Sequence, residues 1–164
     1  MKLRRFAAGL AITPLLITLL PVTAAADSSC WHVRRAERKF AQKMNRARIN
    51  QGKIKLSLDP EASRVARKHT YEMANKKSLY HTPTSLLAWR ITRWSVLAEN
   101  IGAGDSVKSL HRAFMDSPDH TANILSSSFR HVGIGTVRRG GRLWVTVVFE
   151  SVADPGTRLK MPSC

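Results

Sequence analysis

The chain has 164 residues, of which 43% are apolar and 23% are charged. This length and apolar content suit one folded domain and exclude a chain that is disordered throughout. Lysine and arginine number 27 and aspartate and glutamate 11, which gives a net charge of +16. Such an excess of positive charge favours anionic partners, among them wall polymers, phospholipid head groups and nucleic acid.

The first 26 residues have the three parts of a secretory signal peptide. Three of the first five residues are basic, residues 7–20 are apolar and uncharged, and residues 24–26 form a cleavage site of small side chains. The apolar run is shorter than the roughly 20 residues of a spanning helix, which favours cleavage over an uncleaved membrane anchor. Cleavage after Ala26 removes three basic residues and no acidic one, leaving residues 27–164 as a single domain with a net charge of +13.

Export changes which partners a cationic chain meets. A cytoplasmic nucleic-acid-binding protein is a poor interpretation, so we expect no specific nucleic acid as partner. We expect a secreted, extracellular or envelope-associated protein that faces an anionic cell wall or membrane surface, with no transmembrane segment in the mature chain. The two cysteines, Cys30 and Cys164, lie at opposite ends of the mature chain. An oxidising compartment and an even cysteine count favour a disulfide between them over two free thiols.

The mature chain is predicted to begin with helices. Apolar residues recur at steps of three and four over residues 31–50, and again after the Asp59-Pro60 pair, which predicts two amphipathic helices. Residues 78–94 are less regular and contain one short helix. Residues 98–104 form a short extended segment that ends in a glycine turn.

The second half of the chain is predicted to end in a β-hairpin. A third long helix begins after Ser106 and ends before Pro118, and one more helical turn follows. Strand-like residues 132–137 and 143–149 flank a glycine turn. Both faces of the last strand are largely apolar, which predicts helices on both sides of the sheet. The expected fold is α/β, a three-layer α/β/α sandwich around a small, mainly antiparallel sheet.

Histidines supply the strongest candidates for a functional site. His69 lies on the apolar stripe of the second helix and is predicted to be a hydrogen-bonded core residue. His81, Glu99 and His120 each lie at the edge of a regular element, where sites are commonly built. Two imidazoles and a carboxylate suit zinc with an open coordination position, although their spacing is no metal signature by itself. No motif assigns a role to His131.

The order of these residues resembles the CAP superfamily of secreted proteins, whose members carry SCP-like domains, and resembles its bacterial members most. The resemblance runs from about residue 40 to residue 149. Its most specific segments are residues 98–102, Ala-Glu-Asn-Ile-Gly, and residues 117–125, Ser-Pro-Asp-His-Thr-Ala-Asn-Ile-Leu. The resemblance implies the same α/β/α sandwich that the element pattern predicts independently.

The resemblance also implies a cleft that holds two histidines and two acidic residues. His81, Glu99 and His120 match three of these four positions, and Ser117 stands where the second acid would fall. Ser117 and Asn123 are expected to line the cleft beside Glu99. In this family the paired histidines can take a divalent metal, often zinc, so His81 and His120 are the implied metal ligands.

Three functions remain open for such a domain. The favoured one is a non-enzymatic module that binds a ligand or partner at the cell envelope, with lipid or sterol among the ligands that the resemblance implies. The second is a zinc-dependent, protease-like hydrolase in which Glu99 is the general base for a zinc-bound water. The third is a cationic antimicrobial or structural protein. Ser117 in place of the second acid weakens the hydrolase hypothesis, because it removes the carboxylate pair that acid–base catalysis would use.

Overall fold

A computed structural model describes residues 31–92 and 94–151 of the chain. The predicted signal peptide and both cysteines of the predicted disulfide, Cys30 and Cys164, lie outside these residues. None of the helices in the described part of the chain combines the length and the apolar character needed to cross a bilayer.

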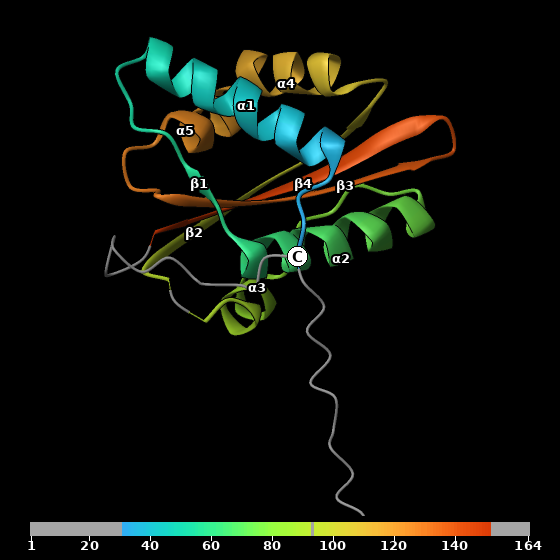
Figure 1. The fold of residues 1–164 in the computed structure, drawn as a ribbon. Coiled ribbons are helices and arrows are strands. Elements are labelled where there is room, and N and C mark those ends of the chain that lie inside the picture. The colour runs from blue at the N-terminus through green and yellow to red at the C-terminus, as the bar shows by residue number, and fades with distance from the viewer. Residues whose placement is uncertain (1–30, 93, 152–164) are drawn as a thin grey trace, which may run out of the picture.

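The fold has one four-stranded sheet between two layers of helices (Figure 1). In spatial order the strands are β1 (Ser57–Leu58), β3 (His131–Arg139), β4 (Arg142–Ser151) and β2 (Val96–Gly104). β1 pairs with β3 in parallel, and the other two pairs are antiparallel. Helices α1 (Arg35–Asn50), α4 (Val107–Asp116) and α5 (Pro118–Leu125) cover one face, and α2 (Pro60–Lys76) and α3 (Thr84–Arg90) cover the other. The predicted α/β/α sandwich with a mainly antiparallel sheet is therefore confirmed.

The central strand β4 supplies apolar side chains to both layers. Val145, Val147 and Phe149 lie in the core cluster that includes α1, α4 and α5. Trp144 and Val148 point the other way, into the clusters formed with α2 and α3. This alternation follows from the pleat of a strand and confirms that both faces of β4 are covered.

Two glycines of β3 let α2 approach the sheet closely. A Cβ atom on Gly133 would lie closer than 3.0 Å to backbone atoms of Ala62, and one on Gly135 would lie equally close to the backbone of Ala66. The Thr70 hydroxyl, on α2, donates a hydrogen bond of 3.1 Å to the carbonyl of Gly135. Backbone therefore packs directly on backbone at this interface.

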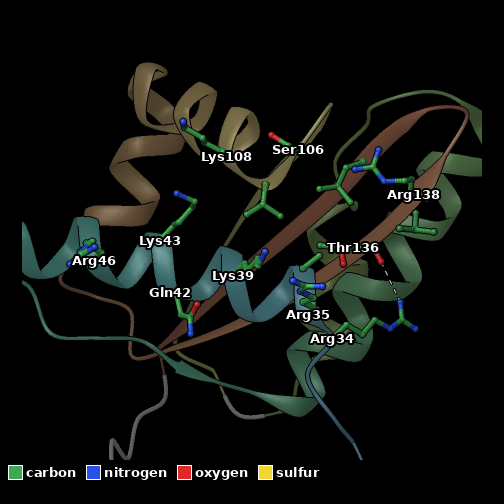
Figure 2. Close-up of a pocket in the computed structure, with 14 residues that line it drawn as sticks. Arg34, Arg35, Lys39, Gln42, Lys43, Arg46, Ser106, Lys108, Thr136 and Arg138 are labelled. Carbon is green, nitrogen blue, oxygen red and sulfur yellow. Dashed lines mark hydrogen bonds between the residues drawn. The ribbon is translucent and has the colours of Figure 1, made fainter.

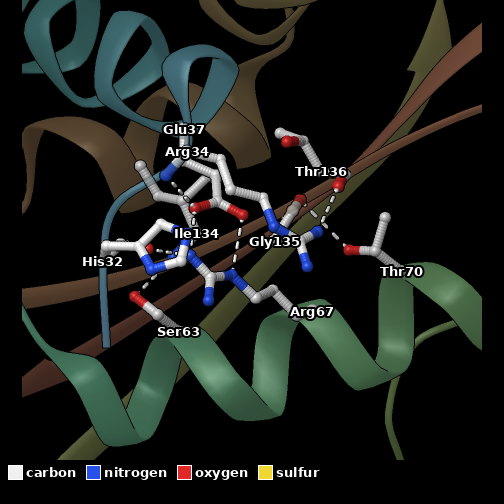
Figure 3. Close-up of polar contacts among 9 residues, drawn as sticks. All are labelled: His32, Arg34, Glu37, Ser63, Arg67, Thr70, Ile134, Gly135 and Thr136. Carbon is white, nitrogen blue, oxygen red and sulfur yellow. Dashed lines mark hydrogen bonds and ion pairs between the residues drawn. The ribbon is translucent and has the colours of Figure 1, made fainter. Parts of the chain in front are cut away.

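A buried ion pair joins the start of α1 to α2 (Figure 3). Arg67 donates to the two oxygens of Glu37 at 2.9 and 2.6 Å, and the Glu37 side chain is only 1% exposed. The backbone N–H of Arg34 donates to the same carboxylate at 2.9 Å. Arg67 also donates to the carbonyl of His32 at 2.7 Å, so one guanidinium holds the segment that leads into α1.

Several elements differ from the prediction, and β3 and β4 extend at both ends beyond the predicted segments 132–137 and 143–149. α1 begins at Arg35 and not at residue 31, because the Arg34 backbone is extended and its N–H is held by a carboxylate. β2 is longer than the predicted segment 98–104, because it pairs with β4 over nine residues. β1 was not predicted at all, since two residues are too short to show an alternating pattern.

Candidate functional site

The predicted site residues gather around β2, which is an edge strand of the sheet. Successive side chains of a strand point to opposite faces. Glu99 therefore faces the loop between α2 and α3, which carries His81, while Asn100 faces α5, which carries His120. We call His81, Glu99 and His120 the histidine cluster.

The carboxylate of Glu99 takes part in three hydrogen bonds, and each of its oxygens has at least one partner. Its Oε1 atom lies 2.9 Å from Nδ1 of His81 and accepts the backbone N–H of Thr82 at 2.9 Å. Its Oε2 atom accepts the Thr82 hydroxyl at 2.8 Å. The Glu99 side chain is 5% exposed and that of His81 is 60% exposed. Glu99 therefore orients the His81 ring, and within residues 31–92 and 94–151 no hydrogen bond engages the second ring nitrogen, Nε2.

A pair of asparagines positions the other histidine. The buried Asn100 donates from Nδ2 to the carbonyl of His120 at 3.0 Å. Asn123 donates in turn to Oδ1 of Asn100 at 2.8 Å. Because both bonds join Asn100 on β2 to residues of α5, they fix this short helix against the edge strand and set the place of His120.

The His120 ring lies in a partly desolvated position. It stacks on Phe114, with 4.6 Å between the ring centroids and an angle of 23° between the ring planes. Among the described residues, its buried Nδ1 atom has no hydrogen-bond partner. Burial lowers the pKa of His120, and the charge of His81 lowers it further, whereas Asp119 acts to raise it. The lowered pKa favours the neutral imidazole, which is the form that binds metals.

This electrostatic coupling gives a testable prediction. Replacing His81 by alanine is expected to raise the pKa of His120, because one positive charge near the ring disappears. Asp119→Asn is expected to lower the pKa of His120 further. Both shifts can be measured by NMR titration of the histidine ring protons. An unchanged His120 titration in both variants would show that the cluster is not coupled through space.

Two predicted lining residues behave differently from each other. Asn123 joins the hydrogen-bond network around β2. Ser117 caps α5 only through its backbone, whose carbonyl accepts the N–H of Thr121 at 2.9 Å. The sequence interpretation missed Thr82 and Asn100 as site residues. Each directly follows a residue that it did identify, and this adjacency was the signal available.

Of the four histidines outside the cluster, two are buried, His69 and His131. His69 is 1% exposed and shares a hydrogen bond of 2.7 Å with the carbonyl of Tyr80, which confirms the predicted core role. His131 is buried on β3, opposite Glu150 in the register with β4. Burial lowers the pKa of His131, while the charge of Asp59 acts to raise it.

A metal at the histidine cluster would have few protein ligands. Across residues 31–92 and 94–151, no three His, Cys, Asp or Glu side chains are grouped so as to hold a metal ion together. Glu99 contacts His81 in the way that a carboxylate orients a metal-binding histidine from behind. Catalytic zinc sites normally use three protein ligands. The described residues therefore do not provide the three protein ligands of such a zinc site.

The described residues have the fold of an SCP-like domain. The chain belongs to the cysteine-rich secretory protein family, CAP, whose family model matches residues 41–149. It is 30% identical over 129 residues to a protein of Bacillus subtilis (strain 168) named "Uncharacterized protein YkwD". That match covers 74% of this chain and 49% of the other protein, so the chain spans about half the length of this curated relative.

Solved structures share the fold at low sequence identity. An outer surface protein from Borrelia burgdorferi has a TM-score of 0.67 and 12% identity, over 75% of this chain and 97% of that one. An extracellular protein containing a SCP domain from Bacillus anthracis has a TM-score of 0.62 and 21% identity, over 70% of this chain and 39% of that one. The resemblance to bacterial CAP proteins is thus confirmed, and these two structures extend it at the level of the fold.

Proposed function

We propose that the protein is a secreted, non-enzymatic binding module that acts at the cell envelope. The signal-peptide pattern of residues 1–26 and the relative described as extracellular support export. The net positive charge supports a location beside an anionic wall or membrane surface, where lipid or sterol are candidate ligands together with other envelope molecules.

The hydrogen bonds of Glu99 are the observation that carries this proposal. A general base needs a carboxylate oxygen that can take a proton from a water or a substrate. Both oxygens of Glu99 already accept hydrogen bonds from His81 and Thr82. Glu99 is thus a positioning residue for His81, and the cluster presents an oriented imidazole for binding.

We further propose that His81 and His120 can hold a divalent metal such as zinc. A bound metal would supply a Lewis acid that attracts an oxygen or nitrogen atom of a ligand. The chain's own residues then have separate tasks. Glu99 orients the ring of His81, Asn100 fixes the segment that carries His120, and burial lowers the pKa of His120, which favours its neutral form.

A zinc titration by calorimetry tests the metal position. Metal-stripped protein comprising residues 27–164, which include every described residue, is expected to bind zinc at one site. His81→Ala/His120→Ala is expected to abolish this binding, and Glu99→Gln to weaken it by about tenfold or more, because the ring of His81 loses its charged partner. His32→Ala, which removes an exposed histidine outside the cluster, is the matched control and should bind as the wild type does.

The outcomes separate the competing functions. No zinc binding by folded wild-type protein would contradict the metal position, and equal binding by the double variant would place the metal elsewhere. Zinc-dependent peptide hydrolysis that disappears in Glu99→Gln, with the fold retained in circular dichroism, would replace the binding module by the hydrolase.

A further inference from the structure

A cationic groove runs along α1, on the opposite side of the sheet from α2 (Figure 2). It has a volume of about 1120 Å³ and lies between α1, the start of α4 and the β3–β4 hairpin. Among the fourteen described residues that line it, seven are basic and none is acidic. We call this surface the α1 groove.

The positive charges of the α1 groove are not neutralised within the described part of the chain. None of the ion pairs found there involves a lining side chain. Glu37, the single acidic residue of α1, is turned away from the groove and paired with Arg67. At one end Arg138 donates to the carbonyl of Asp105 at 2.9 Å, so this guanidinium is held in place while its charge stays uncompensated.

Four of the basic residues form a row along one side of α1. Arg35, Lys39, Lys43 and Arg46 are spaced by four, four and three residues, and all four are exposed. With a rise of 1.5 Å per residue, neighbouring charges lie about 6 Å apart along the axis and the row is about 16 Å long. Like charges at this spacing repel one another and destabilise a helix. An anionic ligand would remove this repulsion.

We propose that the α1 groove binds a linear polyol-phosphate chain, a phosphodiester polymer that carries no bases. A repeated row of cations suits a ligand with repeated phosphates, and Arg35 can bind a phosphate through two parallel hydrogen bonds. The groove is concave, which suits a narrow chain better than a flat bilayer. This site is separate from the histidine cluster and does not rest on the metal position.

The other residues of the groove argue against two alternative anions. Single-stranded nucleic acids are held by aromatic side chains on which bases stack, and none of the described lining residues is aromatic. Membrane-surface helices insert Trp, Phe or Leu next to their basic residues. The apolar lining side chains here include Val107 and Leu143, and Leu143 is buried in the core.

The test measures binding of a fluorescently labelled synthetic oligo(glycerol phosphate) by anisotropy at several salt concentrations. We compare the wild-type chain, residues 27–164, with Lys39→Gln/Lys43→Gln. The groove variant is expected to bind about tenfold more weakly, and the slope of log K against log salt should fall by about 1.4, because two phosphate contacts are lost. The matched control is Lys68→Gln/Lys77→Gln, which removes the same charge from exposed positions of α2 and its cap. It should bind within about twofold of the wild type, as should His81→Ala/His120→Ala.

Several results would overturn the proposal. One is a wild-type chain that does not bind oligo(glycerol phosphate), and another is equal weakening by the groove and control variants. Tighter groove-dependent binding of poly(dT) would assign the surface to nucleic acid. Tighter groove-dependent binding of phosphatidylglycerol vesicles would assign it to a membrane.

Discussion

Gly135→Ala is expected to destabilise the protein by about 3 kcal/mol or more. The added methyl group would fall closer than 3.0 Å to the backbone of Ala66 and Arg67. A side-chain clash can be relieved by a change of rotamer, but here α2 itself would have to move away from the sheet. Because α2 buries apolar side chains against β3 and β4, that movement would open the core. Thermal unfolding followed by circular dichroism measures the effect, expected as a fall in Tm of about 10 °C or more.

The glycines of the β3–β4 turn are the matched control for this change. A Cβ on Gly140 or Gly141 meets nothing within 4 Å, although both residues have a positive φ, 57° and 72°. Gly140→Ala should therefore cost only the left-handed backbone conformation, about 1–2 kcal/mol. A Gly135→Ala protein as stable as Gly140→Ala would show that α2 does not pack backbone-on-backbone against β3.

Glu150→Gln is expected to stabilise the protein by about 3 kcal/mol at pH 7. Glu150 is fully buried on β4, close to the carboxylates of Asp59 and Glu61 at the start of α2. Burial first, and then these two acids, raise the pKa of Glu150 to about 8. Glutamine has nearly the same shape and never ionises, so it removes the need to keep a proton on this side chain.

The sign of the pH dependence follows from the two states of Glu150. Between its unfolded pKa of 4.5 and its folded pKa of about 8, the folded protein holds a proton that the unfolded chain releases. The contribution of Glu150 to the free energy of unfolding should therefore be greatest below pH 4.5. This contribution should fall by about 1.4 kcal/mol per pH unit as the pH rises towards 8.

Urea unfolding from pH 5 to pH 8 measures this slope. Glu150→Gln should flatten it, and Asp116→Asn, at an exposed carboxyl on α4, should leave it as in the wild type. The same pH slope in the wild type and in Glu150→Gln would mean that Glu150 is ionised in the folded protein, because the contributions of the histidines are common to both proteins.

The regular elements could be predicted because their patterns are long. α2 shows a capping aspartate, a proline in its first turn and an apolar stripe, and the structure places it at Pro60–Lys76. The two largely apolar faces of residues 143–149 likewise predicted that helices cover both sides of β4. β1 could not be found, because its two residues are held only by parallel pairing with His131 and Val132, far along the chain. This pairing is a tertiary contact, and no pattern in the sequence near residues 57–58 indicates it.

The sequence predicted the types of residue in the candidate site, but it did not predict the contacts between them. The resemblance pointed to His81, Glu99 and His120, and the structure brings His81 and Glu99 into direct contact. The spacing of residues in the sequence could not predict that Thr82 binds both oxygens of Glu99, because one of those hydrogen bonds uses a backbone N–H. The metal ligation and the role of Ser117 remain predictions. The α1 groove was visible only as an excess of basic residues, because its concave shape depends on α4 and the hairpin.

The place of β4 in the chain has a consequence for synthesis. This strand is the last described element along the chain, yet it lies between β3 and β2 and contributes to the cores under both helix layers. As the polypeptide leaves the ribosome, α1, α2 and α3 have no sheet on which to bury their apolar stripes until residue 151 has emerged. A chain that still lacks β4 therefore holds every described helix but cannot form the two-sided core on which those helices pack.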